Sequence, residues 1–308
     1  MKAGSYGKGP HPVILYHRCA RQRDAGRRMP TKVGAWSVTI LPTMSLRNAM
    51  AHRNLLYLLS LKELRTRYKK SVLGWAWSLF NPVSQMVIYT IIFTKVFPNK
   101  PPIGDPSGLQ VFPLYFLCGA LPFNFFSITV GTAIGGVQNG AGLIKKVQFP
   151  HEHLVFSVVA AQFVTLLIEL VVLTVAMLLN GHMVLPWLPV MLGILVLLGV
   201  FTTGVALALS AANVFFHDVN YLWSILSQLL FFATPIIYSP ANVSISALRI
   251  FANHGPTGSF ITAIHQVIYD LRFPSIGRWA ELIFFAFVSL LVGLRIFNKL
   301  SPRFAEEM

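Results

Sequence analysis

Charged residues are scarce in this chain. Only 11% of its 308 residues are Asp, Glu, Lys or Arg, whereas soluble domains carry about 25%. Acidic residues are the scarcest, with ten Asp and Glu scattered along the sequence. This shortage excludes an ordinary soluble domain. It also argues against a membrane-embedded acyl- or glycosyltransferase, because such an enzyme needs acids, histidines or a nucleotide site clustered at one membrane face.

Several site-forming patterns are also missing. The two cysteines, Cys19 and Cys118, are too far apart in the sequence to indicate a disulfide framework or a thiolate metal site. The chain has no G-x-x-x-x-G-K-[ST] phosphate loop, so we expect no ATP site of that kind. The triplet at residues 151–153, His-Glu-His, places its imidazoles on different faces of a helix, and H-E-x-x-H is absent. We therefore expect no metal site and no cofactor in this chain.

Long apolar runs are abundant instead. Hydrophobic residues make up 55% of the chain, and the mean hydropathy is +0.62. A run of about 20 apolar residues can cross a hydrocarbon core of roughly 30 Å as a helix. The sequence therefore predicts an all-α membrane protein with short amphipathic extracytoplasmic helices before the last span. The six predicted transmembrane helices cover about residues 75–97, 111–137, 154–179, 185–216, 221–238 and 280–297.

The positive charges indicate the orientation in the membrane. The net charge is +15, and fifteen of the 25 Lys and Arg residues lie between Lys2 and Lys70. Two more are Lys145 and Lys146, and three lie near the C-terminus. Because cytoplasmic loops are enriched in Lys and Arg, we expect both termini on the cytoplasmic side of the cytoplasmic membrane. An even number of spans agrees with this orientation.

The region before the first span contains two predicted parts. Residues 1–45 are basic and lack the apolar core of a signal peptide, so we expect a disordered cytoplasmic tail. The transmembrane domain then covers residues 46–308, and it begins with an amphipathic helix at residues 54–70. Its expected apolar stripe consists of Tyr57, Leu61, Leu64 and Tyr68. Such a helix would lie flat at the membrane surface.

Two features inside the spans each permit two interpretations. Glu169 lies deep in the third span, where a charge is costly. It is either a polar point on a substrate path or a protonated packing residue. Phe123, Phe125 and Phe126 belong either to an aromatic belt at the membrane interface or to an internal path, where flat rings can stack on sugars.

Four stretches resemble a known family. The run ELRTRYKKSVLGWAWSLFNPVSQMVIYTIIF is similar to the N-terminal signature of the membrane subunit of type 2 ABC exporters for polysaccharides, the group that exports O-antigen, capsule and teichoic acid. LIKKVQFPHEHL, LLFFATPIIYSP and LSPRFAEEM resemble later family stretches in the same order. Together the matches extend from about Leu55 to Met308.

The resemblance implies a permease without enzymatic activity of its own. Its partners would be a second copy of this chain and two copies of a cytoplasmic ATPase subunit that binds ATP and Mg²⁺. Residues 139–150 would contain the coupling segment that inserts into the ATPase, although an ordinary positively charged loop is the alternative. The coupling residues would be Leu143, Ile144, Lys145, Lys146, Val147, Phe149 and Pro150.

The resemblance also implies a cargo. It would be a polysaccharide linked to a polyprenyl pyrophosphate, and the helix at residues 54–70 would be the gate helix where this lipid is admitted. Cations on that helix would hold the pyrophosphate or bind anionic membrane lipid. An exporter of a drug or lipid is the alternative function. The proposed gate residues are Lys62, Arg65, Arg67, Tyr68, Lys69 and Lys70.

Overall fold

Helices are the regular secondary structure of the residues that the computed structural model describes, which are 53–68, 76–92, 103–140, 142, 149–240 and 243–307. No strand occurs within these ranges, which confirms the all-α prediction. The basic tail predicted at residues 1–45 lies outside them. The helices are α2 (Arg53–Tyr68), α3 (Ala76–Ile91), α4 (Phe112–Asn139), α6 (Glu152–Leu179), α7 (Leu188–Phe215), α8 (Val219–Ala233), α9 (Ser246–His254), α10 (Pro256–Ile264), α11 (Ile276–Leu300) and α12 (Phe304–Glu307). Three short helical turns, η2 (Leu185–Trp187), η4 (His265–Tyr269) and η5 (Ser301–Arg303), join them.

Four helical segments are long and apolar enough to cross a membrane. They correspond to the second, third, fourth and sixth predicted spans and confirm these four at the level of length and composition. Each of the four contains 28 or 31 residues. Their bounds are Phe112–Asn139, Glu152–Leu179, Leu185–Phe215 and Ile276–Arg303.

The first and fifth predicted spans are represented by shorter helices. Helix α3 has 16 residues and α8 has 15, so at 1.5 Å per residue they measure about 24 and 22 Å. Helix α8 stops because Thr234 precedes Pro235 and adopts extended backbone, which residues before proline favour. Residues 93–97, the end of the first predicted span, lie outside the described part of the chain. The count of six spans therefore stays a prediction.

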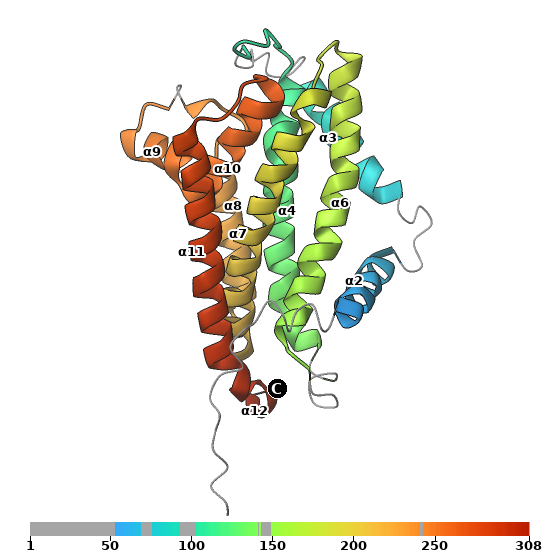
Figure 1. The fold of residues 1–308 in the computed structure, drawn as a ribbon, viewed down its shortest axis with the longest axis vertical. Helices are drawn as coiled ribbons and strands as arrows, with labels where there is room; N and C mark the ends of the chain where they lie inside the picture. The colour runs from blue at the N-terminus through green and yellow to red at the C-terminus, as the bar shows by residue number, and fades with distance from the viewer. Residues whose placement is uncertain are drawn as a thin grey trace, which may run out of the picture. The chain divides into compact units, whose positions relative to one another are not determined.

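Helix α4 occupies the centre of the described bundle. It packs against α6 on one side and against α7 on the other, and α11 packs along α7 (Figure 1). Most of α4 is buried, including Leu114, Val130 and Val137, which have no exposed surface. Pro113 begins this helix at a position where no backbone hydrogen bond is lost. The bundle core thus lies along α4.

The short helices before the last span are inserted among the long ones. Helix α10 contacts α4, α7 and α11, and its Phe260 and Ile264 are fully buried. Helix α9 is mostly exposed, with Ile250 62% accessible. We predicted one or two short amphipathic helices in or dipping into the outer interface, and the structure has two. Helix α9 exposes one face, as expected for an amphipathic helix at an interface, whereas α10 is buried on nearly every side.

Polar contacts fasten η4 to the beginning of α4. The ring of His265 stacks on Tyr115 with centroids 4.2 Å apart, and its Nε2 lies 2.9 Å from the Tyr115 carbonyl oxygen. The Tyr269 hydroxyl donates to the carbonyl oxygen of Leu109 at 2.9 Å. These bonds satisfy buried polar groups and fix the end of the bundle where α4 begins.

Candidate functional site

Helix α2 confirms the helix predicted at residues 54–70 to within two residues at each end. It packs against α6, and its buried leucines are Leu59 and Leu64. In the predicted stripe, Leu64 is buried and Tyr57 is 67% exposed, and the contact of this stripe with the membrane stays a prediction. Leucines together with Tyr57 surround the first two turns, so spacing alone did not identify the face that packs against α6. The exposed apolar side is suited to contact with lipid.

Two cations of α2 have described side chains, and both lie on its exposed surface. The side chains of Lys62 and Arg65 are exposed, and a spacing of three places them on one face of the helix. Arg67 and Tyr68 belong to α2, but their side chains lie outside the described residues, as do Lys69 and Lys70 entirely. The described part of the gate prediction is therefore a pair of neighbouring exposed cations.

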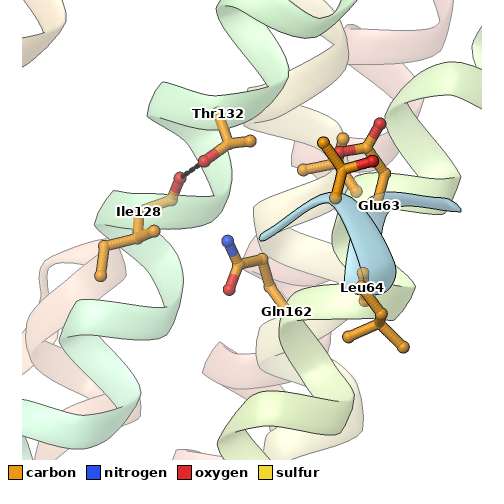
Figure 2. Close-up of a pocket in the computed structure, with 8 residues that line it drawn as sticks. Glu63, Leu64, Ile128, Thr132 and Gln162 are labelled. Carbon is orange, nitrogen blue, oxygen red and sulfur yellow. Dashed lines mark hydrogen bonds between the residues drawn. The ribbon is translucent and has the colours of Figure 1, made fainter. Parts of the chain in front are cut away.

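A cleft lies between α2, α4 and α6 (Figure 2). Its volume is about 280 Å³. Among the described residues that line it, four are polar and four are apolar, and none of these eight is Lys or Arg. The lining residues are Glu63, Leu64, Thr66, Ile128, Thr132, Val158, Ala161 and Gln162.

The sequence analysis did not identify this cleft. Two signals were present: Glu63 and Thr66 are three residues apart on α2, and Gln162 is a lone polar side chain in the early part of an apolar run. Thr132 donates its hydroxyl hydrogen to the carbonyl oxygen of Ile128 at 2.7 Å, so its oxygen lone pairs face outward from the helix backbone. The spacing of these residues in the sequence did not indicate which helices would bring them together.

The coupling residues Leu143, Ile144, Lys145, Lys146 and Val147 lie outside the described part of the chain, so this prediction is untested. The segment's end, Phe149 and Pro150, is described and half-buried.

The C-terminal turn holds that end in place. The ring of Phe149 lies 5.6 Å from that of His151, and His151 Nδ1 lies 3.1 Å from the Ser301 hydroxyl. Phe304 is fully buried, with its ring 5.4 Å from Phe297 and 6.2 Å from His151. The exit of the coupling segment is thus joined to the ends of α11 and α12.

The histidines at residues 151–153 have separate surroundings. Burial lowers the pKa of His151, whereas His153 is buried with its Nδ1 3.2 Å from the carbonyl oxygen of Pro150. Among the described residues, no three His, Cys, Asp or Glu side chains group as metal ligands would. The arrangement serves helix packing at the beginning of α6.

The aromatic residues assigned to a path are packed inside the bundle. Phe123, Phe125 and Phe126 are each at most 5% exposed. Phe123 contacts Phe231 of α8 with ring centroids 5.5 Å apart, and Phe126 stacks on Phe201 of α7 at 5.4 Å. Glu169 of α6 is half-buried. In this conformation the three rings form helix contacts, and their role in a path stays a prediction.

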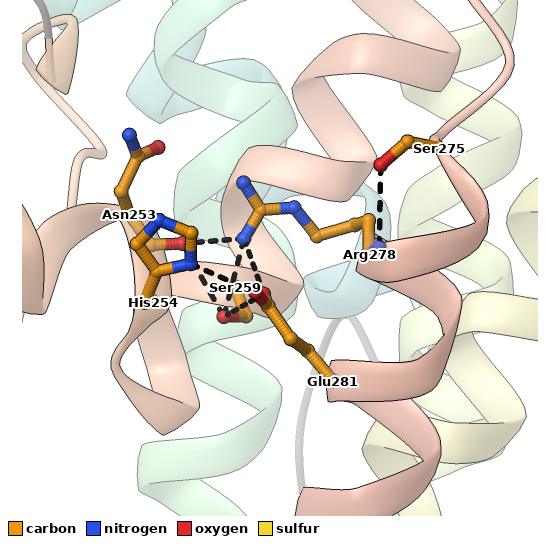
Figure 3. Close-up of polar contacts among 6 residues, drawn as sticks. All are labelled: Asn253, His254, Ser259, Ser275, Arg278 and Glu281. Atoms are coloured by element: carbon orange, nitrogen blue, oxygen red, sulfur yellow. Dashed lines mark hydrogen bonds and ion pairs between the residues drawn. The ribbon is translucent and has the colours of Figure 1, made fainter.

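A polar cluster that the sequence analysis missed joins α9 and α10 to α11 (Figure 3). Glu281 accepts from Arg278 at 2.8 Å, lies 2.8 Å from His254 Nδ1 and accepts from the Ser259 hydroxyl at 3.2 Å. Arg278, whose side chain is only 10% exposed, also donates to the backbone carbonyl of Asn253. The pair Arg278 and Glu281, three apart on one helix, was the available signal.

Comparisons with known proteins agree with this architecture. The profile of the ABC-2 type transporter family matches residues 54–269. O-antigen export system permease protein RfbA of Myxococcus xanthus is 30% identical over 264 residues, covering 85% of this chain and 98% of the relative. RfbA of Klebsiella pneumoniae is 30% identical over 258 residues, covering 82% and 94%. Polysialic acid transport protein KpsM of Escherichia coli is 32% identical over 87 residues, covering 28% and 31%. The chain therefore belongs to the ABC-2 type transporter family.

Proposed function

We propose that this chain is the membrane subunit of an exporter that moves a polyprenyl-pyrophosphate-linked polysaccharide across the cytoplasmic membrane. The observation that carries the proposal is the near full-length similarity to two permeases of O-antigen export systems. The alignments cover 98% and 94% of those two relatives, so the similarity extends over nearly their whole length.

The energy for export comes from a separate ATPase subunit. The sequence contains no phosphate loop of its own, so ATP and Mg²⁺ bind to the partner. Residues 139–150 dock on that partner, with Lys145 and Lys146 setting the orientation. The ring contacts of His151 with Phe149 and with the buried Phe304 support this proposal, because a movement imposed on the segment would pass directly into packed helix ends.

The functional unit is a homodimer of this chain with two ATPase subunits. Helix α8 offers a contact surface for the second copy, because it is shorter than the four long apolar helices and exposes a row of apolar side chains. The end of the bundle at which α4 ends and α6 begins faces the cytoplasm, together with both termini, in agreement with the positive charges there. Exposed residues of α8 include Tyr221, Leu222, Ile225, Leu229 and Phe232.

The cargo approaches α2 from the inner leaflet. Lys62 and Arg65, exposed on one face of α2, hold its pyrophosphate by charge-assisted hydrogen bonds.

Controlled depletion of the chain in its native cell tests the function. Lipid-linked glycan precursors should accumulate inside the cell while surface glycan is lost, as measured by thin-layer analysis of extracted lipids and by surface staining. Normal surface glycan after depletion contradicts the proposal and favours export of a drug or another lipid.

A further inference from the structure

The cleft between α2, α4 and α6 has the chemistry of a sugar site. We propose that it binds the first sugar ring of the lipid-linked cargo, the one attached to the pyrophosphate, and this inference rests on the proposed function. Its volume of about 280 Å³ is larger than the roughly 150 Å³ of an engineered cavity that admits a benzene ring. A six-membered sugar ring with its hydroxyl groups therefore fits.

The lining matches both faces of a sugar ring. Ile128, Val158 and Ala161 offer apolar surface to the ring's C–H groups. Thr132 and Gln162 offer a hydroxyl and an amide, and Glu63 offers a carboxylate that accepts hydrogen bonds from sugar hydroxyls. Figure 2 shows the Gln162 amide directed into the space between α4 and α2.

Other occupants fit this lining less well. A hydrocarbon chain would remove the carboxylate of Glu63 from water without giving it a hydrogen bond. A phosphate would be repelled by the carboxylate of Glu63, and the described lining residues include no Lys or Arg to offset that repulsion. The ligand should therefore give hydrogen bonds to the polar lining residues and carry no negative charge. An uncharged ligand rich in hydroxyl groups meets both requirements.

The register of α2 separates sugar binding from phosphate binding. Glu63 and Thr66 line the cleft and are one turn apart. Lys62 and Arg65, each one residue earlier, are exposed, and one residue corresponds to a rotation of about 100° around the helix. A pyrophosphate bound to these cations would therefore lie beside the cleft. The sugar attached to that pyrophosphate would enter the cleft.

The depth of the cleft agrees with a lipid headgroup. Thr132 lies seven residues before the end of α4 at Asn139, and Gln162 lies ten residues after the start of α6 at Glu152. At 1.5 Å per residue, these positions are about 10 and 15 Å from the helix ends. This is the region where headgroups meet acyl chains.

Equilibrium binding to the full chain in lipid nanodiscs tests the inference without any ATPase. Two radiolabelled probes are compared: farnesyl pyrophosphate, and the same lipid carrying N-acetylglucosamine on its pyrophosphate. The wild-type chain should bind the glycosylated probe about tenfold more tightly, since a few hydrogen bonds account for such a factor. Gln162→Leu should abolish this preference and leave the affinity for farnesyl pyrophosphate unchanged.

Two further variants complete the experiment. Thr132→Val should also reduce the sugar preference, and it preserves side-chain shape if Gln162→Leu lowers the yield of folded protein. The matched control Gln228→Leu makes the same substitution on the exposed surface of α8 and should leave both affinities unchanged. Replacing Lys62 and Arg65 with Gln should lower the affinity for both probes by the same factor.

Equal affinity of the wild-type chain for the two probes, or failure to bind either, overturns the sugar site. Persistence of the preference in both cleft variants overturns it as well. These outcomes are distinguishable from failure of the proposed function: surface glycan could still be lost on depletion without a sugar preference, and a sugar preference could persist although depletion leaves surface glycan normal.

Discussion

Gly293 of α11 lies directly against Gly204 of α7. A Cβ atom added to Gly293 would overlap the backbone of Gly204, and one added to Gly204 would overlap the backbone of Ser289. Ser289 also donates its hydroxyl hydrogen to the carbonyl oxygen of Phe201 at 2.9 Å. Small residues at such a crossing let helix backbones approach within a membrane, where packing and interhelical hydrogen bonds hold helices together.

Gly293→Ala should separate α7 from α11. The added methyl group meets backbone, which cannot rotate away, so we expect the free energy of unfolding to fall by about 1–3 kcal/mol. Unfolding of the purified chain measured by intrinsic fluorescence checks this. The control is Gly277→Ala on the same helix, where the new Cβ would meet only the Ser275 hydroxyl oxygen at 4.0 Å. Equal stability of the two variants would contradict the close approach.

Arg278→Met should loosen α9 and α10 from α11. Arg278 donates to Glu281 at 2.8 Å and to the backbone carbonyl of Asn253, and hydrogen bonds of charged groups contribute about 1.5–3 kcal/mol. We expect a loss of that size in the free energy of unfolding. Faster proteolysis between α9 and α10 should accompany it. Arg295→Met, an exposed position on the same helix, serves as control and should match the wild type.

Asp270→Asn should stabilise the chain at neutral pH. Burial, assisted by the nearby carboxylate of Asp105, raises the pKa of Asp270 to about 6. Its ordinary value is 3.8, so the folded chain binds the proton more tightly than the unfolded chain. The stability that this proton contributes is present below about pH 4 and is lost as pH rises through 6. The Asn variant should therefore unfold at a higher temperature than the wild type at pH 7.5 and at a similar temperature at pH 4.

The exposed Asp218 provides the control for this pH dependence. Asp218→Asn should follow the wild type at both pH values. An Asp270→Asn chain that is no more stable than the wild type at pH 7.5 would show that the Asp270 carboxylate is not destabilised by its surroundings.

Reversing the charges of Lys145 and Lys146 should prevent docking of the ATPase. With both residues changed to Glu, we expect at least about a tenfold drop in the ATPase that co-purifies, since like charges at an interface are strongly unfavourable. Membrane insertion should be normal. Reversal of Lys100 and Arg272, on the predicted outer side, should leave co-purification intact. If the Lys145 and Lys146 variant co-purifies with as much ATPase as the wild type does, the assignment of residues 139–150 as the coupling segment is wrong.

Much of the helical architecture could be predicted because bilayer thickness sets a simple rule for length. The runs at residues 111–137, 154–179, 185–216 and 280–297 each exceed what a soluble helix needs and each forms a long helix. The helix at Arg53–Tyr68 was also predictable, because apolar residues and cations recur in it at helical spacing.

The contacts between elements could not be predicted in the same way. The local sequence does not distinguish the inserted α10 from the exposed α9. The two helices differ in their contacts with the long helices, which are set by the tertiary packing of the bundle. In the cluster around Glu281, the contact with His254 joins two residues that are 27 positions apart in the sequence. The cleft at Glu63 and Gln162 depends on how α2 packs against α6. Such tertiary relationships follow from packing, which periodicity does not encode.

The most direct test of the whole account is transport in proteoliposomes. The chain is reconstituted with its ATPase subunit, and a fluorescent lipid-linked glycan is followed by its protection from a membrane-impermeant quencher. The account predicts movement across the bilayer only when both the ATPase and ATP are present. Movement against a gradient by this chain alone would contradict it.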